Sequence, residues 1–461
     1  MSKKRFSTQR QARAIGPATI GLVLVLICAS AEGQAPPAPA PSAEEAAGAV
    51  PLGKRYVDAM HGYSLRPPAE AQRARESAAG QLVNWSHYDE QTGAIDWALS
   101  VHRAVEANPP AELKAYADAL AQKLLAEKDL KVETTELAPV AGKAAIHFRG
   151  TTLGIAMWQR QTWILSQPGA FLVVTMQGPK DRAERLDRIA EAVLGSVEVH
   201  DPTAALEQRR ANLDRGEKLL TSLTGRELAG AIRPEAQWYL LRLDGETVGF
   251  RRVVESPARR EGADGYLVKT LVLLEMPNFE PRLMRQELFV TPELDVERWG
   301  TRLQVGSGDG ALVVDESGLK QEELIVCNVL QGDKLRTFKK QIPGRFYLPQ
   351  AIGVLLPRLV KLDQLAAYGF AAYDAERNDF NLRTFTVVGP QRASIGGQEV
   401  DAFVATDRAA DDAEPARLIL DAQGNLLQMQ TADGLVMERA SETAVMSRLP
   451  RAAGILKAAG E

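Results

Sequence analysis

Cysteine and histidine are scarce in this chain of 461 residues, and both scarcities limit its chemistry. There are only two cysteines, Cys28 and Cys327, so a disulfide framework cannot hold the fold. All five histidines precede residue 201: His61, His87, His102, His147 and His200. This excludes Ser-His-Asp and Cys-His catalysis, and a histidine zinc site, from the rest of the chain. No two histidines have metal-ligand spacing, so we expect no metal and no cofactor.

The sequence also lacks a cluster of lysine and arginine interleaved with aromatic residues. Its formal net charge is −4. Removing residues 1–31 would take away five positive charges and no negative ones, so the charge would move to −9. Nucleic acid and anionic membrane surfaces are therefore not expected partners.

Residues 1–31 predict export. Basic residues from Lys3 to Arg13 precede an apolar run over residues 15–27, and Ala29-Ser30-Ala31 fits a signal-peptide cleavage site. Two alternatives stay open, a retained membrane anchor and a lipidated Cys28. The apolar run is shorter than the roughly 20 residues of a spanning helix, and the bulky Ile27 precedes Cys28. We expect a periplasmic or extracellular protein that meets a membrane only through its N-terminus.

After cleavage Cys327 would be the one cysteine left. It lies in the apolar run LIVCNVL, which predicts a buried, inert thiol rather than a nucleophile.

The remaining chain divides by composition into five segments. We expect an Ala/Pro-rich linker over residues 32–53, an α+β domain over 54–201, a linker helix over 202–235, a β-rich domain over 236–442 and a C-terminal tail over 443–461. In the α+β domain, apolar residues at helical spacing predict helices over 111–127 and 181–194. Between them lie predicted strands at 130–137, 144–149, 154–161, 162–167 and 171–177. The expected fold is an antiparallel sheet covered by helices.

Five stretches of this domain carry a family resemblance: YVDAMHGYSLRPP, WALSVHR, AGKAAIHF, FLVVTMQGP and VLGSVEVHDP. On these stretches residues 54–201 resemble the PsbP-like and DcrB-like exported domains. The resemblance implies an α+β sandwich with accessory or assembly roles, and it supplies no catalytic residues.

The β-rich domain begins with WYLLRLDGETVGFRRVVE, residues 238–255. Asp244-Gly245 predicts a hairpin with a type I′ turn. Tyr239, Leu241 and Leu243 would then point to one face and Leu240 and Arg242 to the other, so that one face can pack and the other can meet water. Strand after strand follows, separated by glycine-containing turns such as residues 306–310. One apolar helix is expected over residues 348–362, kinked by Pro357.

A mainly antiparallel β domain with one such helix resembles the half-barrels of the LolA/LolB-like lipoprotein carriers. WYLLRLDGETVGF and LILDAQGNLLQMQ suit that plan. The resemblance implies a curved sheet with a concave apolar face, and it transfers no functional residue.

The predicted ligand-binding residues are those expected to line this concave face: Trp299, Phe346, Tyr347, Leu355 and Leu359. The alternative is that these side chains simply make the core. The acidic runs YDAERNDF and DRAADDAEP lack the EF-hand pattern and read as solvated loops, with weak calcium binding as the alternative. No catalytic residue is predicted.

These observations favour an exported, non-enzymatic accessory protein of the cell envelope that holds a lipid-like or peptide ligand in its β-rich domain. Two alternatives are an envelope-assembly module without a small ligand and a carboxylate-dependent hydrolase, whose paired acids cannot be recognised from sequence.

Native mass spectrometry of the purified protein separates the first two hypotheses. A co-purified acyl ligand is expected for a carrier. Ligand-free protein with a defined pull-down partner is expected for an assembly module.

Overall fold

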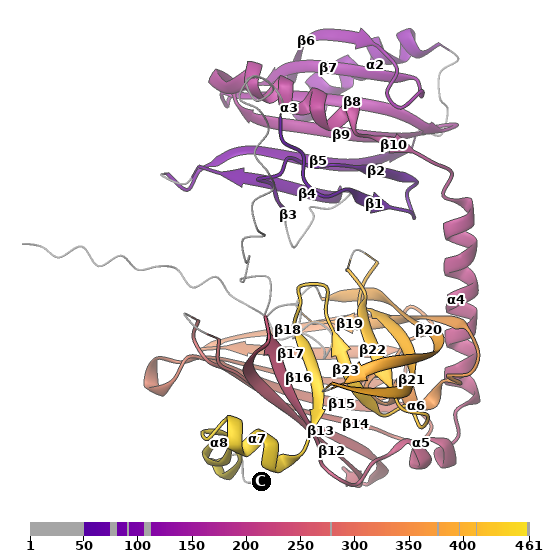
Figure 1. The fold of residues 1–461 in the computed structure, drawn as a ribbon. Coiled ribbons are helices and arrows are strands. Elements are labelled where there is room, and N and C mark those ends of the chain that lie inside the picture. The colour runs from indigo at the N-terminus through magenta and orange to yellow at the C-terminus, as the bar shows by residue number, and fades with distance from the viewer. Residues whose placement is uncertain are drawn as a thin grey trace, which may run out of the picture. The chain divides into compact units, whose positions relative to one another are not determined.

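The structure, a computed structural model, describes residues 50–73, 81–89, 92–105, 112–276, 279–375, 378–395, 397–411 and 413–458. The predicted signal segment with Cys28, and nearly all of the linker, lie outside these residues. The chain forms two compact units, one ending at Gln208 and one beginning at Arg209 (Figure 1). Both combine helices with antiparallel sheets, as the α+β prediction requires. Within the described residues, no helix has the length and apolar character needed to cross a membrane.

The first unit contains a seven-stranded sheet of order β3-β4-β5-β9-β8-β7-β6 and a small sheet of order β1-β2-β10. Its elements are β1 (Tyr56–Asp58), β2 (Tyr63–Leu65), β3 (Gln72–Arg73), β4 (Gln81–Tyr88), β5 (Ile95–Val105), α2 (Leu113–Lys128), β6 (Leu130–Leu137), β7 (Ala145–Thr152), β8 (Met157–Gln167), β9 (Ala170–Pro179), a 3-10 turn (Lys180–Arg182), α3 (Ala183–Gly195) and β10 (Glu198–Val199).

Alternation along β9 gives this sheet two cores. Phe171 and Val173 pack with α2, whereas Leu172 and Val174 pack with α3. The predicted sheet covered by helices is therefore confirmed. The two strands expected over residues 154–167 are instead the single strand β8, because its ladder with β7 runs unbroken through Gln161.

The second unit is built on one antiparallel sheet of order β18-β17-β16-β15-β14-β13-β12-β11-β24-β23-β22-β21-β20-β19. Its elements are α4 (Thr203–Ser222), which crosses the division between the units, α5 (Gly225–Ala231), β11 (Gln237–Leu243), β12 (Glu246–Arg260), β13 (Ala263–Leu274), β14 (Arg282–Val290), β15 (Val296–Val305), a 3-10 turn (Gly308–Gly310), β16 (Leu312–Gln321), β17 (Leu324–Gln331), β18 (Lys334–Gln341), α6 (Gln350–Leu359), β19 (Ala366–Asp374), β20 (Asp379–Ile395), β21 (Gln398–Arg408), β22 (Ala416–Leu420), β23 (Leu426–Gln430), β24 (Val436–Ala440), α7 (Glu442–Arg448) and α8 (Ala452–Ala458).

The predicted hairpin is present as β11 and β12. Asp244 and Gly245 have φ of 51° and 83°, as a type I′ turn requires. Tyr239 and Leu241 lie in the main core, whereas Leu240, on the other face, is also buried and does not meet water. It belongs to a second core formed with α7 and α8, two helices that lie mostly within the segment expected as a C-terminal tail.

Helix α6 fills the space that the curved sheet encloses. Four of its side chains, Ala351, Ile352, Leu355 and Leu356, are fully buried and join one core with residues from β11 through β24. The sequence prediction missed two strands of this sheet, β19 with nine residues and β24 with five.

Helix α4 packs against β19 through a glycine. A Cβ on Gly216 would lie 2.0 Å from the carbonyl oxygen of Gly369, which leaves no room for a side chain. Beside this contact Arg215 Nε donates to the carbonyl oxygen of Ala367 at 2.8 Å.

We expect Gly216→Ala to lower the free energy of unfolding of this unit by about 1–3 kcal/mol, because the added methyl group forces α4 away from β19. Gly230→Ala is the matched control, since a Cβ at Gly230 meets nothing within 4 Å and alanine favours the helix. Urea unfolding measures both. Equal effects of the two substitutions would refute this packing.

Candidate functional site

The N-terminus of α6 is fixed by a buried acid. Glu297, on β15, accepts hydrogen bonds from the Tyr347 hydroxyl at 2.7 Å and from the backbone N–H of Gln350, the first helical residue. A carboxylate at this end also suits the helix dipole. Burial raises the pKa of Glu297 to about 7, against the opposing effect of these hydrogen bonds.

The middle of α6 is held by an arginine on β20. Pro357 has no N–H to donate to the carbonyl oxygen of Gly353, and Arg383 Nη2 donates to that oxygen instead, at 3.1 Å. Arg383 also binds the carboxylate of Asp407 through two hydrogen bonds of 2.9 and 2.6 Å. Helix α6 therefore accommodates Pro357 and ends two residues after it.

The C-terminal end of α6 is tied to β12. Arg358 binds Glu255 through two hydrogen bonds of 2.9 and 2.6 Å, and both side chains are almost completely buried. Glu255 also accepts from the backbone N–H of Arg233 and from Gln237. Its carboxylate is therefore fully satisfied, as a buried charge must be.

The five predicted ligand-binding residues all lie in or beside the main core. Trp299, Tyr347 and Leu355 are buried, whereas Phe346 and Leu359 are half-buried. Trp299 and Tyr347 are joined by a series of ring contacts through Tyr373 and Phe380, with centroids 5.7–5.9 Å apart. Phe346 lies on a segment that bonds with the edge of β19 through Ala371.

The concave apolar face expected to receive a ligand is thus occupied by the protein's own helix. An acyl chain lying where α6 lies would have to displace the helix and break its three charged contacts. Aspartate at Leu355, which is 0% exposed, would unfold this unit rather than report on a ligand.

A second buried acid lies near Trp299. Glu316, on β16, accepts a hydrogen bond from Trp299 Nε1 at 2.6 Å. Burial raises its pKa to about 8, so it is protonated at neutral pH. Burial also raises the pKa of the neighbouring Cys327 thiol to about 12, as expected for an inert cysteine. Among the described residues no group of three or more His, Cys, Asp or Glu side chains could hold a metal ion.

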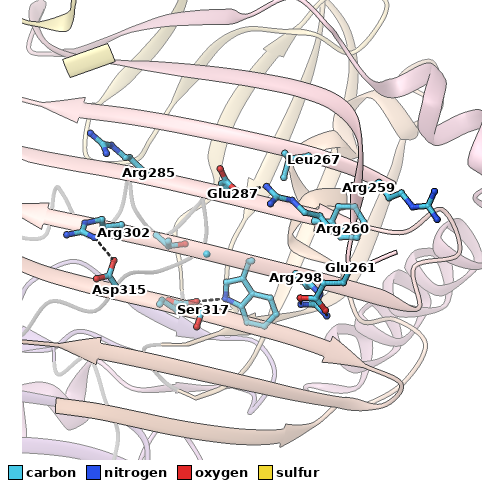
Figure 2. A pocket seen from close by; sticks show the side chains of 15 residues that line it. Arg259, Arg260, Glu261, Leu267, Arg285, Glu287, Arg298, Arg302, Asp315 and Ser317 are labelled. Atoms are coloured by element: carbon cyan, nitrogen blue, oxygen red, sulfur yellow. Dashed lines mark hydrogen bonds and ion pairs between the residues drawn. The ribbon is translucent and has the colours of Figure 1, made fainter. Parts of the chain in front are cut away.

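A cavity lies over strands β12 to β16 (Figure 2). Most of its lining side chains alternate along the strands with those of the main core, so it lies on the face of the sheet opposite α6. Its volume is about 770 Å³. Five arginines line it: Arg259, Arg260, Arg285, Arg298 and Arg302. Leu267 and Phe289 add apolar surface.

Most charges of this cavity are paired. Arg260 binds Glu287 at 2.9 Å, Arg298 pairs with Glu261, and Arg302 lies 3.6 Å from Asp315. These partly exposed pairs are weak and are screened by salt.

Arg285 differs from the other four arginines. It lies directly opposite Arg302 in the ladder between β14 and β15, and like charges at opposed positions destabilise a sheet. No hydrogen bond or ion pair of Arg285 is found in the described part of the chain, and its Nε is buried without a partner. An anion between the two guanidinium groups would relieve this repulsion.

Gly300 forms part of the floor of the cavity, with Glu287 opposite it on β14 and Ser317 opposite it on β16. Because glycine has no side chain, this part of the floor stays open. A Cβ at Gly300 would meet no atom closer than 4.0 Å. This site escaped the sequence prediction because its arginines come from three strands. The available signal was a pair of arginines four residues apart, Arg298 and Arg302, which share one face of a strand.

Comparisons with known proteins identify no family. No family model matches the chain, and no curated protein matches it. A solved structure of cyanobacterial PsbP from Synechocystis sp. PCC 6803 is similar at 16% identity, covering 34% of this chain and 96% of that chain, with a TM-score of 0.26.

Two further structures are similar. A β-barrel-like protein of the domain of unknown function DUF1849 from Brucella abortus shares 13% identity, covering 45% of this chain and 95% of that chain, with a TM-score of 0.34. A structure from Bacteroides thetaiotaomicron shares 13% identity over 38% of this chain and 62% of that chain, with a TM-score of 0.22. These are resemblances of architecture, and with TM-scores below 0.5 they assign no function.

We expect the free energy of unfolding to decrease less steeply with rising pH in Glu316→Gln than in the unaltered protein. The folded protein holds the Glu316 proton up to a pKa of about 8, whereas the unfolded chain releases it near 4.5. Stability from this proton is therefore complete below pH 4.5 and lost as the pH rises to 8, at about 1 kcal/mol per pH unit. Urea unfolding at pH 5, 6, 7 and 8 measures this slope, and identical slopes for both proteins would disprove the assignment.

Proposed function

We propose that this chain is an exported, non-enzymatic binding protein of the cell envelope. Its larger unit binds an acidic segment of a partner protein in the arginine-lined cavity over β12 to β16. The observation that supports this most directly is Arg285, which has no acidic partner among the described residues and lies directly beside Arg302 in the lining of a cavity of about 770 Å³. Export rests on the signal pattern of residues 1–31.

Charge complementarity favours an acidic occupant. Five arginines line the cavity with four acids, Glu261, Glu287, Asp315 and the buried Glu316, although the whole chain carries a formal charge of −4. Arg259 also lies 3.7 Å from Asp264, outside the lining. An arginine presents a planar fork that binds a carboxylate through two hydrogen bonds. Glutamate and aspartate side chains of an extended segment supply this group, and Leu267 and Phe289 offer contact for its methylene groups.

A bound lipid is less well supported because α6 occupies the interior of the sheet. Hydrolysis by paired carboxylates is also less well supported. A general acid needs a raised pKa and access to the substrate. Glu316 has the raised pKa, but it is buried and bonded to Trp299. The three exposed acids of the cavity are each held by arginine.

Arg285→Gln tests this proposal. Removing a charged donor from the site is expected to weaken binding of a fluorescein-labelled peptide of eight glutamates roughly tenfold or more, since a hydrogen bond to a charged group contributes about 1.5–3 kcal/mol. No acid is left orphaned by the change. Fluorescence anisotropy at low and physiological salt measures the dissociation constant, which should rise with salt.

Two further variants give the test its controls. Gly300→Val should fill the floor of the cavity and reduce binding without disturbing the strand, where a β-branched residue is favoured. Arg392→Gln removes an arginine that is 80% exposed on β20, outside the cavity, and should leave affinity unchanged. Unchanged affinity in Arg285→Gln and Gly300→Val, or equal binding of an eight-lysine peptide, would refute the proposal. Tighter binding of single-stranded DNA than of the acidic peptide would reassign the cavity to phosphates.

A further inference from the structure

A second, smaller cavity of about 100 Å³ lies on the interior side of the sheet, beside α6. It is separate from the arginine-lined cavity described above. Three arginines and two carboxylates line it: Arg251, Arg358, Arg383, Glu255 and Asp407. Because these five side chains come from β12, α6, β20 and β21, the site exists only in the folded unit.

Two of the three arginines are neutralised in place. Arg358 is bound by Glu255 and Arg383 by Asp407, each through two hydrogen bonds. Each of the two carboxylates therefore already pairs with one arginine. The third arginine has no carboxylate left to pair with.

This third arginine is Arg251. Its side chain is only 8% exposed, and no carboxylate of the described residues lies within 4.0 Å of it. Its Nη1 is 3.8 Å from the sulfur of Met437, a weak acceptor, and its Nε has no hydrogen-bond partner in the described part of the chain.

The strand neighbours of Arg251 offer no acid either. It lies opposite Tyr239 on β11 and Val272 on β13. The Tyr239 hydroxyl donates to Gln237. A buried, uncompensated charge is strongly unfavourable unless something pairs with it.

We propose that this cavity binds one small carboxylate anion, of the size of formate or acetate, at the guanidinium group of Arg251. The two N–H groups of the fork match the two oxygens of a carboxylate. A water occupies roughly 30 Å³ in the liquid, so the cavity admits an anion of this size but no acyl chain. The bound anion balances the third arginine and stabilises the packing of α6 against β11 and β12.

The test is thermal unfolding of the whole protein in increasing sodium acetate, at constant ionic strength maintained with the bulky anion 2-(N-morpholino)ethanesulfonate. Acetate should raise the Tm saturably, by roughly 3–8 °C at a hundredfold excess over Kd. Arg251→Met should abolish the rise while it leaves the protein folded, because an apolar side chain of similar length replaces an unpaired buried charge.

Arg252→Met is the matched control. Arg252 is the next residue of β12 and points to the other face, where it lies 5.3 Å from the ring of Trp238. This variant should keep the response to acetate. A rise in Tm that persists in Arg251→Met would overturn the proposal, as would a rise that follows ionic strength alone. An equal rise with chloride would overturn the assignment to a carboxylate. The outer-cavity variant Arg285→Gln should respond to acetate like the unaltered protein, so the two proposals can fail separately.

Discussion

The larger unit depends on the anchoring of one apolar helix inside a curved sheet by buried charged groups. Glu297 binds the first turn of α6, Arg383 binds the carbonyl oxygen that Pro357 leaves free, and Glu255 binds Arg358 at the other end. Each contact comes from a different strand. Apolar packing alone would leave the rotation and depth of α6 loosely defined. The charged contacts define both, since breaking one would leave a buried charge without a partner.

Because α6 occupies most of the interior of the sheet, we place the proposed binding sites of this unit outside the space that the helix fills. The face opposite α6 carries a cavity whose arginines are only partly paired with acids. The interior contains a small cavity in which the arginines outnumber the carboxylates by one. Both proposals follow from the same kind of observation, a guanidinium group without a carboxylate. They differ in burial and in size, which separates an exposed site for an acidic protein segment from an enclosed site for a small anion.

The local patterns were informative where neighbouring residues decide the outcome. Strand β6 has the predicted bounds, residues 130–137. The turn at Asp244-Gly245 was predictable because few residue pairs tolerate two positive φ values. Patterns failed where distant contacts decide. β19 and β24 are held by their sheet neighbours, and Leu240 is covered by helices from the end of the chain.

The sequence by itself determined the α+β class, the antiparallel strands, an apolar helix near Pro357 and the absence of histidine from the larger unit. These follow from periodicity, turn chemistry and composition, which are local or countable. Only the tertiary structure decided that α6 fills the sheet and that Trp299, Tyr347 and Leu355 lie in the core. It also decided that Arg285 lies opposite Arg302. In the small cavity that contains Arg251, it placed three arginines beside only two carboxylates. Charge balance in a cavity depends on which strands are neighbours, and strand order is set by the packing of the whole unit.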